Sequence, residues 1–397
     1  MSNNRPVKFF AYFFILFLSL IVLNIGCYFV IKVVYGTSIY GDDYNNLKLQ
    51  FYKDKTQKHF VHPFFGLAST KDETFQSPLG IDHIFDSIDK SENKDEIKIL
   101  IIGGSVAAFL SRNKAENQKS KFEQAVFFEE LNKTYKTNRF AVYNAALGGG
   151  KQPQSYFKLI HLDLMGFKPD LVLNVDGFNE IALSMSDNFD ASIPPIYPRQ
   201  HNRAIARTAL DKHCPMSNYL SSSNTKVPLI ELMSVIYLSR CHNEINIGPK
   251  DKTYWGYQEN FSYERYLMES INVWAESSNK INDFLLSKNI KYIHAIQPNQ
   301  YHEESKPLND EELNEIKVLG FPYYGVHIKN HYDKLKTSML NASNISDLRF
   351  LFKTDKRTLY ADQCCHFNDL GNRELARAII NQNDNIFRSL LNRNNEK

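Results

Sequence analysis

Apolar residues in this chain form one long run near the N-terminus and several short runs farther along. The long run, residues 9–31, contains no charged side chain, and a run of about 20 residues or more can cross a bilayer as a helix. The short runs are nearly continuous, as in buried parallel strands, and segments with a helical period lie between them. The pattern predicts a membrane-spanning helix followed by a domain in which strands and helices alternate.

The alternating part predicts a three-layer α/β/α fold, because strands joined by helices form a parallel sheet covered on both faces. Asn368 is a suitable N-cap for the last helix. Binding sites in such sheets form at the carboxyl ends of the strands, so residues that directly follow a strand are candidates for the site. The expected strands are 97–102, 140–143, 171–175 and 290–296, and the expected helices are 122–131, 155–165, 263–286 and 368–383.

Residues 184–258 interrupt the alternation with prolines and a serine-rich stretch around one apolar helix candidate at 229–238. This composition predicts an insertion rather than a second core, and the insertion is a candidate lid or glycan groove. The other segments are expected to be a cytoplasmic N-terminus with the membrane anchor, a stalk, the main domain and a polar tail. They span residues 1–35, 36–96, 97–385 and 386–397.

The flanks of the apolar run indicate an uncleaved anchor and its orientation. A signal peptide is the alternative, but its apolar region is usually about 7–15 residues long and ends in small residues, and no such cleavage site follows this run. Arg5 and Lys8 precede the run, whereas Asp42 and Asp43 follow Lys32. The positive-inside rule therefore predicts a cytoplasmic N-terminus and an exported domain, in the periplasm or at the cell surface.

Composition narrows the function classes. The 397 residues carry a net charge of +3, with basic and acidic residues interspersed, so the chain lacks the concentrated basic patch of a nucleic-acid binder and no nucleic-acid partner is expected. Of the five cysteines, Cys214 and Cys241 either form a disulfide in the exported domain or stay unpaired. No pair has the Cys-x-x-Cys spacing of a metal site, so no metal and no cofactor are expected.

Residues suited to a serine nucleophile and its base lie far apart in the sequence. Ser105 follows Gly103 and Gly104 after the first expected strand, where glycines permit a sharp turn and a helix N-terminus favours anions. A serine hydroxyl needs a base, and His366, just before the last helix, can reach over the sheet edge, with Asp362 to orient its ring. Taken alone, Ser105 also fits a helix-capping serine in a glycine-rich turn.

Two further segments offer donors for an oxyanion. Gly149 follows the second expected strand and presents a backbone N–H without a side chain in the way. Asn179 follows the third expected strand and offers its side-chain amide, and the N–H of Ser105 completes the set. Singly, Gly149 fits a flexible loop and Asn179 fits a helix cap, so the prediction depends on all the segments together and on their order.

In this order the segments resemble the SGNH (GDSL-type) hydrolase family, which carries Gly-Asp-Ser, Asn-x-x-x-x-Gly, Gly-x-Asn-Asp and Asp-x-x-His blocks. The counterparts within residues 97–383 are Gly-Gly-Ser105, Asn144 to Gly149, Gly-Phe-Asn179-Glu, and Asp362 to His366. The resemblance implies a flavodoxin-like SGNH fold with Ser105 as nucleophile and His366 as base. It also implies an oxyanion hole made by the N–H of Ser105, the N–H of Gly149 and the amide of Asn179.

Two positions depart from the family pattern. Gly104 stands where the family has the aspartate of its first block, as is common in membrane-anchored relatives. Asp362 lies four residues before His366 rather than three, and Gln363 occupies the usual place of the acid. Either a bulge restores the geometry of a triad, or His366 works with Ser105 as a dyad.

Two other folds use similar glycines. An α/β-hydrolase also has a serine elbow, but its elbow comes after several strands and its acid well before its histidine. A dinucleotide-binding fold needs Gly-x-Gly-x-x-Gly, and here Ser105 and Ala108 take the second and third glycine places. Both folds are therefore disfavoured.

The sequence predicts a membrane-anchored serine esterase or acyl hydrolase that acts through an acyl-enzyme on an ester or an acylated glycan. The anchored, exported domain resembles family members that remove or transfer acetyl groups on cell-envelope polysaccharides, so the resemblance implies work on O-acetyl groups. The alternative is a non-catalytic, membrane-anchored protein of this fold that binds a glycan or a protein partner. The altered spacing of Asp362 is the main support for that alternative.

Overall fold

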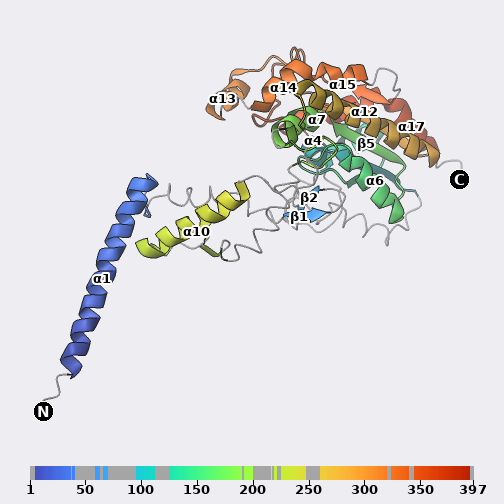
Figure 1. Cartoon of the computed structure of the whole chain (residues 1–397). Helices are drawn as coiled ribbons and strands as arrows, with labels where there is room; N and C mark the ends of the chain where they lie inside the picture. The colour runs from blue at the N-terminus through green and yellow to red at the C-terminus, as the bar shows by residue number, and fades with distance from the viewer. Residues whose placement is uncertain are drawn as a thin grey trace. The chain divides into compact units, whose positions relative to one another are not determined.

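The structure of the chain is a computed structural model with two compact units. The first comprises Met1–Gln57 and Ile205–Tyr254, and the second comprises Lys58–Ala204 and Trp255–Lys397. The second unit holds the central sheet, and the first holds the long N-terminal helix (Figure 1). The residues that the structure describes are 5–36, 38–40, 59–62, 66–69, 95–111, 125–189, 192–199, 216, 219–220, 225–246, 260–319, 323–338 and 344–393.

A five-stranded parallel sheet forms the centre of the second unit. Its strands, in spatial order, are β4 (Phe140–Asn144), β3 (Ile97–Gly103), β5 (Leu171–Asp176), β6 (Lys291–Ile296) and β7 (Ile345–Asp347). The four strands predicted from apolar runs are confirmed, and every residue of β5 is buried, as expected of a strand covered on both faces. The edge strand β7 has only three residues and was not predicted.

Helices cover both faces of this sheet, which gives the predicted three-layer α/β/α fold. One face packs against α4 (Ser105–Ser111), α5 (Val126–Tyr135) and α16 (Asp369–Gln382), and the other against α6 (Gln154–Leu164) and α12 (Tyr263–Ser287). The helices predicted at 155–165, 263–286 and 368–383 are confirmed. The helix predicted at 122–131 instead begins at Val126, after the extended N-cap Ala125, and runs to Tyr135 as α5. Asn368 caps α16, because its side-chain oxygen accepts the N–H of Gly371 at 2.9 Å.

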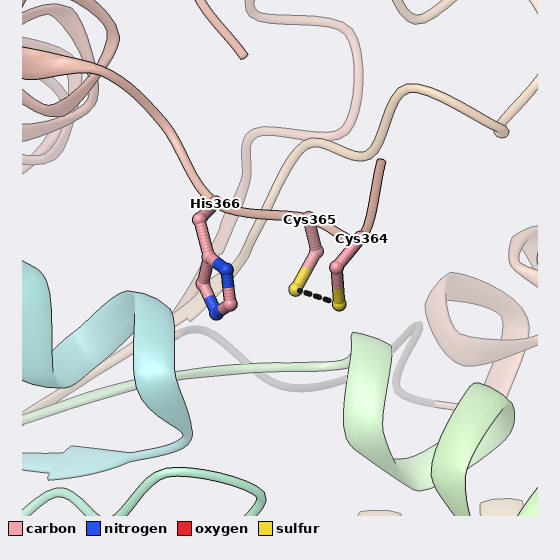
Figure 2. Close-up of side chains that lie close together, drawn as sticks. All are labelled: Cys364, Cys365 and His366. Atoms are coloured by element: carbon pink, nitrogen blue, oxygen red, sulfur yellow. Dashed lines mark hydrogen bonds between the residues drawn. The ribbon is translucent and has the colours of Figure 1, made fainter. Parts of the chain in front are cut away.

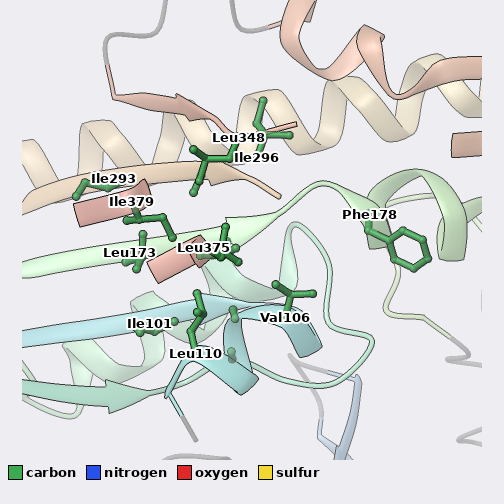
Figure 3. Close-up of a cluster of buried hydrophobic side chains, with 14 of the residues drawn as sticks. Ile101, Val106, Leu110, Leu173, Phe178, Ile293, Ile296, Leu348, Leu375 and Ile379 are labelled. Atoms are coloured by element: carbon green, nitrogen blue, oxygen red, sulfur yellow. The ribbon is translucent and has the colours of Figure 1, made fainter. Parts of the chain in front are cut away.

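Alternate residues of each strand pack against opposite helical layers, because side chains point to alternate faces of a sheet. Ile101 belongs to the cluster that includes α16, whereas its neighbour Leu100 belongs to the cluster that includes α6. Figure 3 shows Ile101, Leu173 and Ile293 from three strands beside Leu375 of α16. The core therefore holds the strands in register and brings their carboxyl ends to one edge.

The C-terminal stretch belongs to this unit as well. The sequence assigned residues from 386 onward to a polar tail, but the chain forms helix α17 (Asp384–Arg393), in which Phe387 and Leu390 are buried in the main core. The other elements among the described residues of this unit are a hairpin within the expected stalk, four short helices and a π-helical turn. They are β1 (His59–His62), β2 (Gly66–Ser69), α7 (Phe178–Leu183), η1 (Ser184–Phe189), α13 (Asp310–Leu319), α14 (Tyr323–His331) and α15 (Asp333–Ser338).

The described part of the first unit contains two long helices that pack on each other. They are α1 (Arg5–Val34) and α10 (Pro228–Asn246). Within α1, Tyr12–Val34 is long and apolar enough to cross a membrane. Ile31 and Val235 pack together between the helices, and Asn24 accepts a hydrogen bond from the N–H of Leu229 at 3.2 Å. A polar side chain of α1 is thereby satisfied by the first turn of α10.

The predicted insertion at 184–258 is divided between the two units. Residues up to 204 belong to the unit with the sheet, and Ile205–Tyr254 belongs to the unit with α1. The helix candidate at 229–238 is confirmed as part of α10. Cys214 and the side chain of Cys241 lie outside the described residues, so their disulfide stays a prediction.

Candidate active site

Ser105 lies at the first position of α4, directly after the carboxyl end of β3. Two glycines make this turn possible. Gly103 has a φ of 128°, and a Cβ there would overlap the carbonyl oxygen of Val175. A Cβ on Gly104 would overlap the side-chain amide of Asn179. The amide of Asn179 therefore fills the space that a side chain at position 104 would need.

His366 connects Ser105 to Asp362, although 261 positions separate the serine from the histidine. Its Nε2 lies 2.7 Å from the Oγ of Ser105, and its Nδ1 is hydrogen-bonded to Oδ2 of Asp362. A carboxylate can only accept, so in the neutral ring Nδ1 carries the proton and Nε2 presents its lone pair to the serine hydroxyl. This tautomer is the one that can take a proton from Ser105.

A tight turn accommodates the four-residue spacing between Asp362 and His366. The second carboxylate oxygen, Oδ1, accepts the backbone N–H groups of Cys364, Cys365 and His366 at 2.8, 3.1 and 3.3 Å. The N–H of Ala361 donates to the carbonyl of His366 at 2.9 Å and closes the turn at its base. The altered spacing therefore does not separate the acid from the histidine.

Burial and charge act in opposite directions on this pair. Burial alone would raise the pKa of Asp362, but the hydrogen bond and charge of His366 outweigh it and hold that pKa below its usual value. Burial alone would lower the pKa of His366, but Asp362 outweighs it and raises that pKa above its usual value. The carboxylate therefore makes His366 a stronger proton acceptor than a free histidine.

Two side chains that the sequence did not single out hold this turn in place. Gln300 donates from Nε2 to the carbonyls of Asp362 at 3.0 Å and Cys364 at 3.3 Å. The hydroxyl of Tyr301 donates to the carbonyl of Gln363. Both residues come soon after β6, at the sheet edge where such sites form, and that position is the signal that could have found them.

The predicted oxyanion donors lie on the neighbouring loops. Asn179 is the second residue of α7, and its Nδ2 donates to the carbonyl of Gly150 at 2.6 Å. Gly149 has a φ of 70°, and a Cβ there would lie 2.6 Å from Nη1 of Arg199. Arg199 is paired in turn with Asp187, and both were expected within the insertion. Part of that insertion therefore lies against the Gly149 loop.

A buried polar network supports the loop that carries Asn179, and the sequence did not predict it. Asp176, at the end of β5, accepts the indole N–H of Trp274 at 2.7 Å and is 2.6 Å from Nε2 of His294. Glu180 accepts the N–H of Gln152 at 3.1 Å, and burial raises its pKa to about 8. A mostly protonated Glu180 beside ionised Asp176 avoids two like charges in the core.

Two thiols lie beside the histidine, as Figure 2 shows. The Sγ atoms of Cys364 and Cys365 are 3.1 Å apart. Together with a ring nitrogen of His366, they form a group whose atoms all lie within 4.8 Å of one another. Among the described residues, this group has the composition to hold a metal ion.

No protein-family model matches this chain, and no curated protein matches its sequence. In structure it is similar to LAE5, an alpha/beta hydrolase enzyme from the metagenome of Lake Arreo, Spain, with 11% identity over 74% of this chain and 96% of that one and a TM-score of 0.38. It is also similar to a putative GDSL-like lipase from Parabacteroides merdae, with 10% identity over 72% of this chain and 95% of that one and a TM-score of 0.33.

A third similar structure is a catalytic mutant of Axe2, an acetylxylan esterase from Geobacillus stearothermophilus. Its identity is 12% over 72% of this chain and 93% of that one, with a TM-score of 0.35. Identities and TM-scores this low transfer no residue role to this chain. The chemistry must be argued from the side chains of this chain itself.

Proposed function

We propose that this chain is a membrane-anchored serine esterase of the SGNH (GDSL) type. The observation that carries the proposal is the hydrogen-bonded series from Ser105 through His366 to Asp362. His366 takes the hydroxyl proton as Oγ attacks an ester carbonyl, then returns it to the leaving alcohol as the C–O bond breaks. His366 next takes a proton from water, which attacks the acyl carbonyl, and then returns that proton to Oγ of Ser105 as the acyl–oxygen bond breaks and the acid leaves.

The proposed oxyanion hole consists of the N–H of Ser105, the N–H of Gly149 and the side-chain amide of Asn179. The amide of Asn179 is held against Gly104, next to Ser105, by its hydrogen bond to Gly150. An amide nitrogen carries two hydrogens, so the second can serve an oxyanion. Each such donor is typically responsible for about 100–1,000-fold in rate.

The substrate that we propose is an O-acylated glycan of the cell envelope. The proposal takes α1 as the membrane span and the cytoplasm as the side of the N-terminus, so that the catalytic unit faces the outer side, where such glycans lie. It is supported by the length and apolar composition of α1 and by Arg5 and Lys8 before the apolar run. The insertion supplies substrate contacts in this proposal, and Arg199 beside Gly149 is its first candidate. If a sugar hydroxyl replaces water in the second step, the same residues transfer the acetyl group instead of releasing it.

The direct test uses the full-length protein in detergent with p-nitrophenyl esters of increasing acyl length and a serine-reactive phosphonate. We expect ester hydrolysis and a phosphonate adduct on the peptide that contains Ser105. Ser105→Ala should abolish both. Ser111→Ala is the matched control on the same helix, because that hydroxyl only donates to carbonyls within α4 at 3.0 and 3.1 Å, and this variant should keep both.

A folded wild-type protein that neither hydrolyses any ester nor accepts the phosphonate would contradict this proposal. The same would follow if Ser105→Ala fully rescued the phenotype of a gene deletion. Either result would favour the non-catalytic, glycan- or protein-binding alternative. The spacing of Asp362 no longer supports that alternative, because the carboxylate is hydrogen-bonded to His366.

A further inference from the structure

The two adjacent cysteines present their side chains on the same side of the chain as His366 (Figure 2). Neighbouring side chains of an extended strand point to opposite faces, so this arrangement depends on the turn that contains them. The Sγ atoms of Cys364 and Cys365 approach to 3.1 Å, and a nitrogen of His366 completes a group within 4.8 Å. Two thiols and one imidazole are a ligand set that Zn²⁺ and other thiophilic ions prefer.

The turn is fixed before any ion binds. Oδ1 of Asp362 accepts the N–H groups of Cys364, Cys365 and His366, so one carboxylate oxygen holds the backbone of all three ligand residues. Gln300 holds the carbonyl of Cys364 from the other side. Because these hydrogen bonds already order the turn, metal binding costs little backbone entropy.

The neutral imidazole of His366 has one lone pair to offer a metal ion. Metal-bound imidazoles typically donate their second ring N–H to a carboxylate, and here Nδ1 is hydrogen-bonded to Asp362. The lone pair of Nε2 then faces Ser105, at 2.7 Å from Oγ. Cys365 is 1% exposed and interacts with the same hydroxyl, so its sulfur lies close to Ser105 as well as to His366.

We propose that Cys364, Cys365 and His366 form a binding site for a thiophilic divalent cation such as Zn²⁺, and that the bound cation inhibits the active site. Two S–H bonds break and two metal–sulfur bonds form, and both protons go to solvent. The neutral imidazole gives its one lone pair to the metal, so it can no longer accept the proton of Ser105, whose hydroxyl or a water fills the fourth position. Tetrahedral Zn–S bonds of about 2.3 Å put two sulfurs about 3.8 Å apart, so the thiols open slightly.

Binding depends only on the three ligands, whereas inhibition rests on the proposed function. Binding is therefore tested first, on full-length reduced protein in detergent without oxygen, with Co²⁺ as a spectroscopic probe. We expect the charge-transfer absorption of a cobalt–thiolate site, and loss of that absorption when Zn²⁺ is added. Cys364→Ser and Cys365→Ser should each weaken binding by roughly 10-fold or more. Cys27→Ser, in α1, is the matched control and should leave the spectrum unchanged.

The activity arm uses the same protein with p-nitrophenyl acetate. Zn²⁺ should inhibit hydrolysis and phosphonate labelling, a chelator should restore both, and Mg²⁺ should have no effect because it prefers oxygen ligands. Cys364→Ser should lose at least 10-fold of the sensitivity to Zn²⁺, with each rate compared with the rate of the same variant in the absence of metal.

The outcomes separate the two proposals. A cobalt spectrum that is the same with and without these cysteines overturns the metal site. The metal site is also overturned if the reduced protein binds no metal. That conclusion holds even if the two thiols form a disulfide in air. A cysteine-dependent spectrum in a protein that hydrolyses no ester supports the metal site and contradicts the esterase. If Zn²⁺ binds through the cysteines but does not lower the rate of hydrolysis, the inferred inhibition of the active site is overturned.

Discussion

At the scale of single residues, one carboxylate has two functions in this site. Oδ2 of Asp362 sets the tautomer of His366, and Oδ1 holds the backbone of the turn in which both residues lie. The first function is electronic and the second is structural, so a substitution that preserves shape separates them. Asparagine keeps an oxygen that can accept N–H groups, but its charge is gone.

We expect Asp362→Asn to lower kcat by about 10⁴-fold, because an amide N–H facing Nδ1 would favour the wrong tautomer. Gln363→Ala, at the position where the family pattern has its acid, should stay near wild type. Steady-state rates with p-nitrophenyl acetate check both variants. A severe loss in Gln363→Ala with a mild loss in Asp362→Asn would contradict the assignment of the acid.

The raised pKa of His366 predicts the acid limb of the pH profile. The base must be neutral to accept a proton, so kcat/KM should fall as pH drops through the pKa of His366, which lies above 6.5 in the folded protein. Asp362→Asn removes the charge that raises this pKa, so the limb should move to lower pH in the residual activity. If the acid limb of kcat/KM lies at the same pH in Asp362→Asn as in the wild type, the titration of another group sets it.

A substitution at Gly104 tests the steric link between the serine turn and the oxyanion donor. A Cβ there would displace the amide of Asn179, and loss of that donor should lower kcat by about 100–1,000-fold in Gly104→Ala. Gly148→Ala is the matched control, because a Cβ at Gly148 meets no atom within 4 Å. Equal activity of the two alanine variants would exclude Asn179 from the oxyanion hole.

At the scale of elements, the last helix carries more of the fold than its polar sequence indicates. Phe387 of α17 is fully buried. Its ring centroid lies 6.3 Å from that of Phe127 and 6.2 Å from that of Phe140. We expect Phe387→Ala to lower the free energy of unfolding by about 3–5 kcal/mol. Arg388→Ala, next in sequence with its charge exposed, should change it little. Denaturant unfolding of the full-length protein measures both variants. An unchanged free energy of unfolding in Phe387→Ala would show that this segment does not stabilise the core.

The apolar pattern predicted β3, β4, β5 and β6 because both faces of a covered parallel strand are buried, and that leaves a continuous apolar run. The same rule could not find β7, since its three residues include a serine and an aspartate. Helix α17 was missed for another reason: its apolar residues recur with helical spacing, but polar residues outnumber them. Short edges and peripheral helices thus depend on tertiary contacts that a local pattern does not contain.

At the scale of the whole molecule, sequence order predicted which distant residues meet better than local detail did. Ser105, His366 and Asp362 could be named because their chemistry is distinctive and loops after parallel strands converge. The supporting pair of Asp176 and His294 could not, because 118 positions separate them and a polar residue within a strand has no visible partner in sequence. Contacts of that kind exist only once the sheet is formed.

The two units are joined by three chain crossings, at 57–58, 204–205 and 254–255, so the catalytic unit stays attached to the unit that holds α1. If α1 spans a membrane, as proposed, its orientation sets the side on which this unit functions, since α1 holds the one candidate span among the described residues. Arg5 and Lys8 predict that a C-terminal alkaline phosphatase fusion is active in a bacterial host and that a C-terminal fluorescent-protein fusion is dark. Reversing both charges to glutamate should reduce the phosphatase signal. A bright fluorescent fusion with inactive phosphatase would put the catalytic unit in the cytoplasm, and envelope glycans would then be out of its reach.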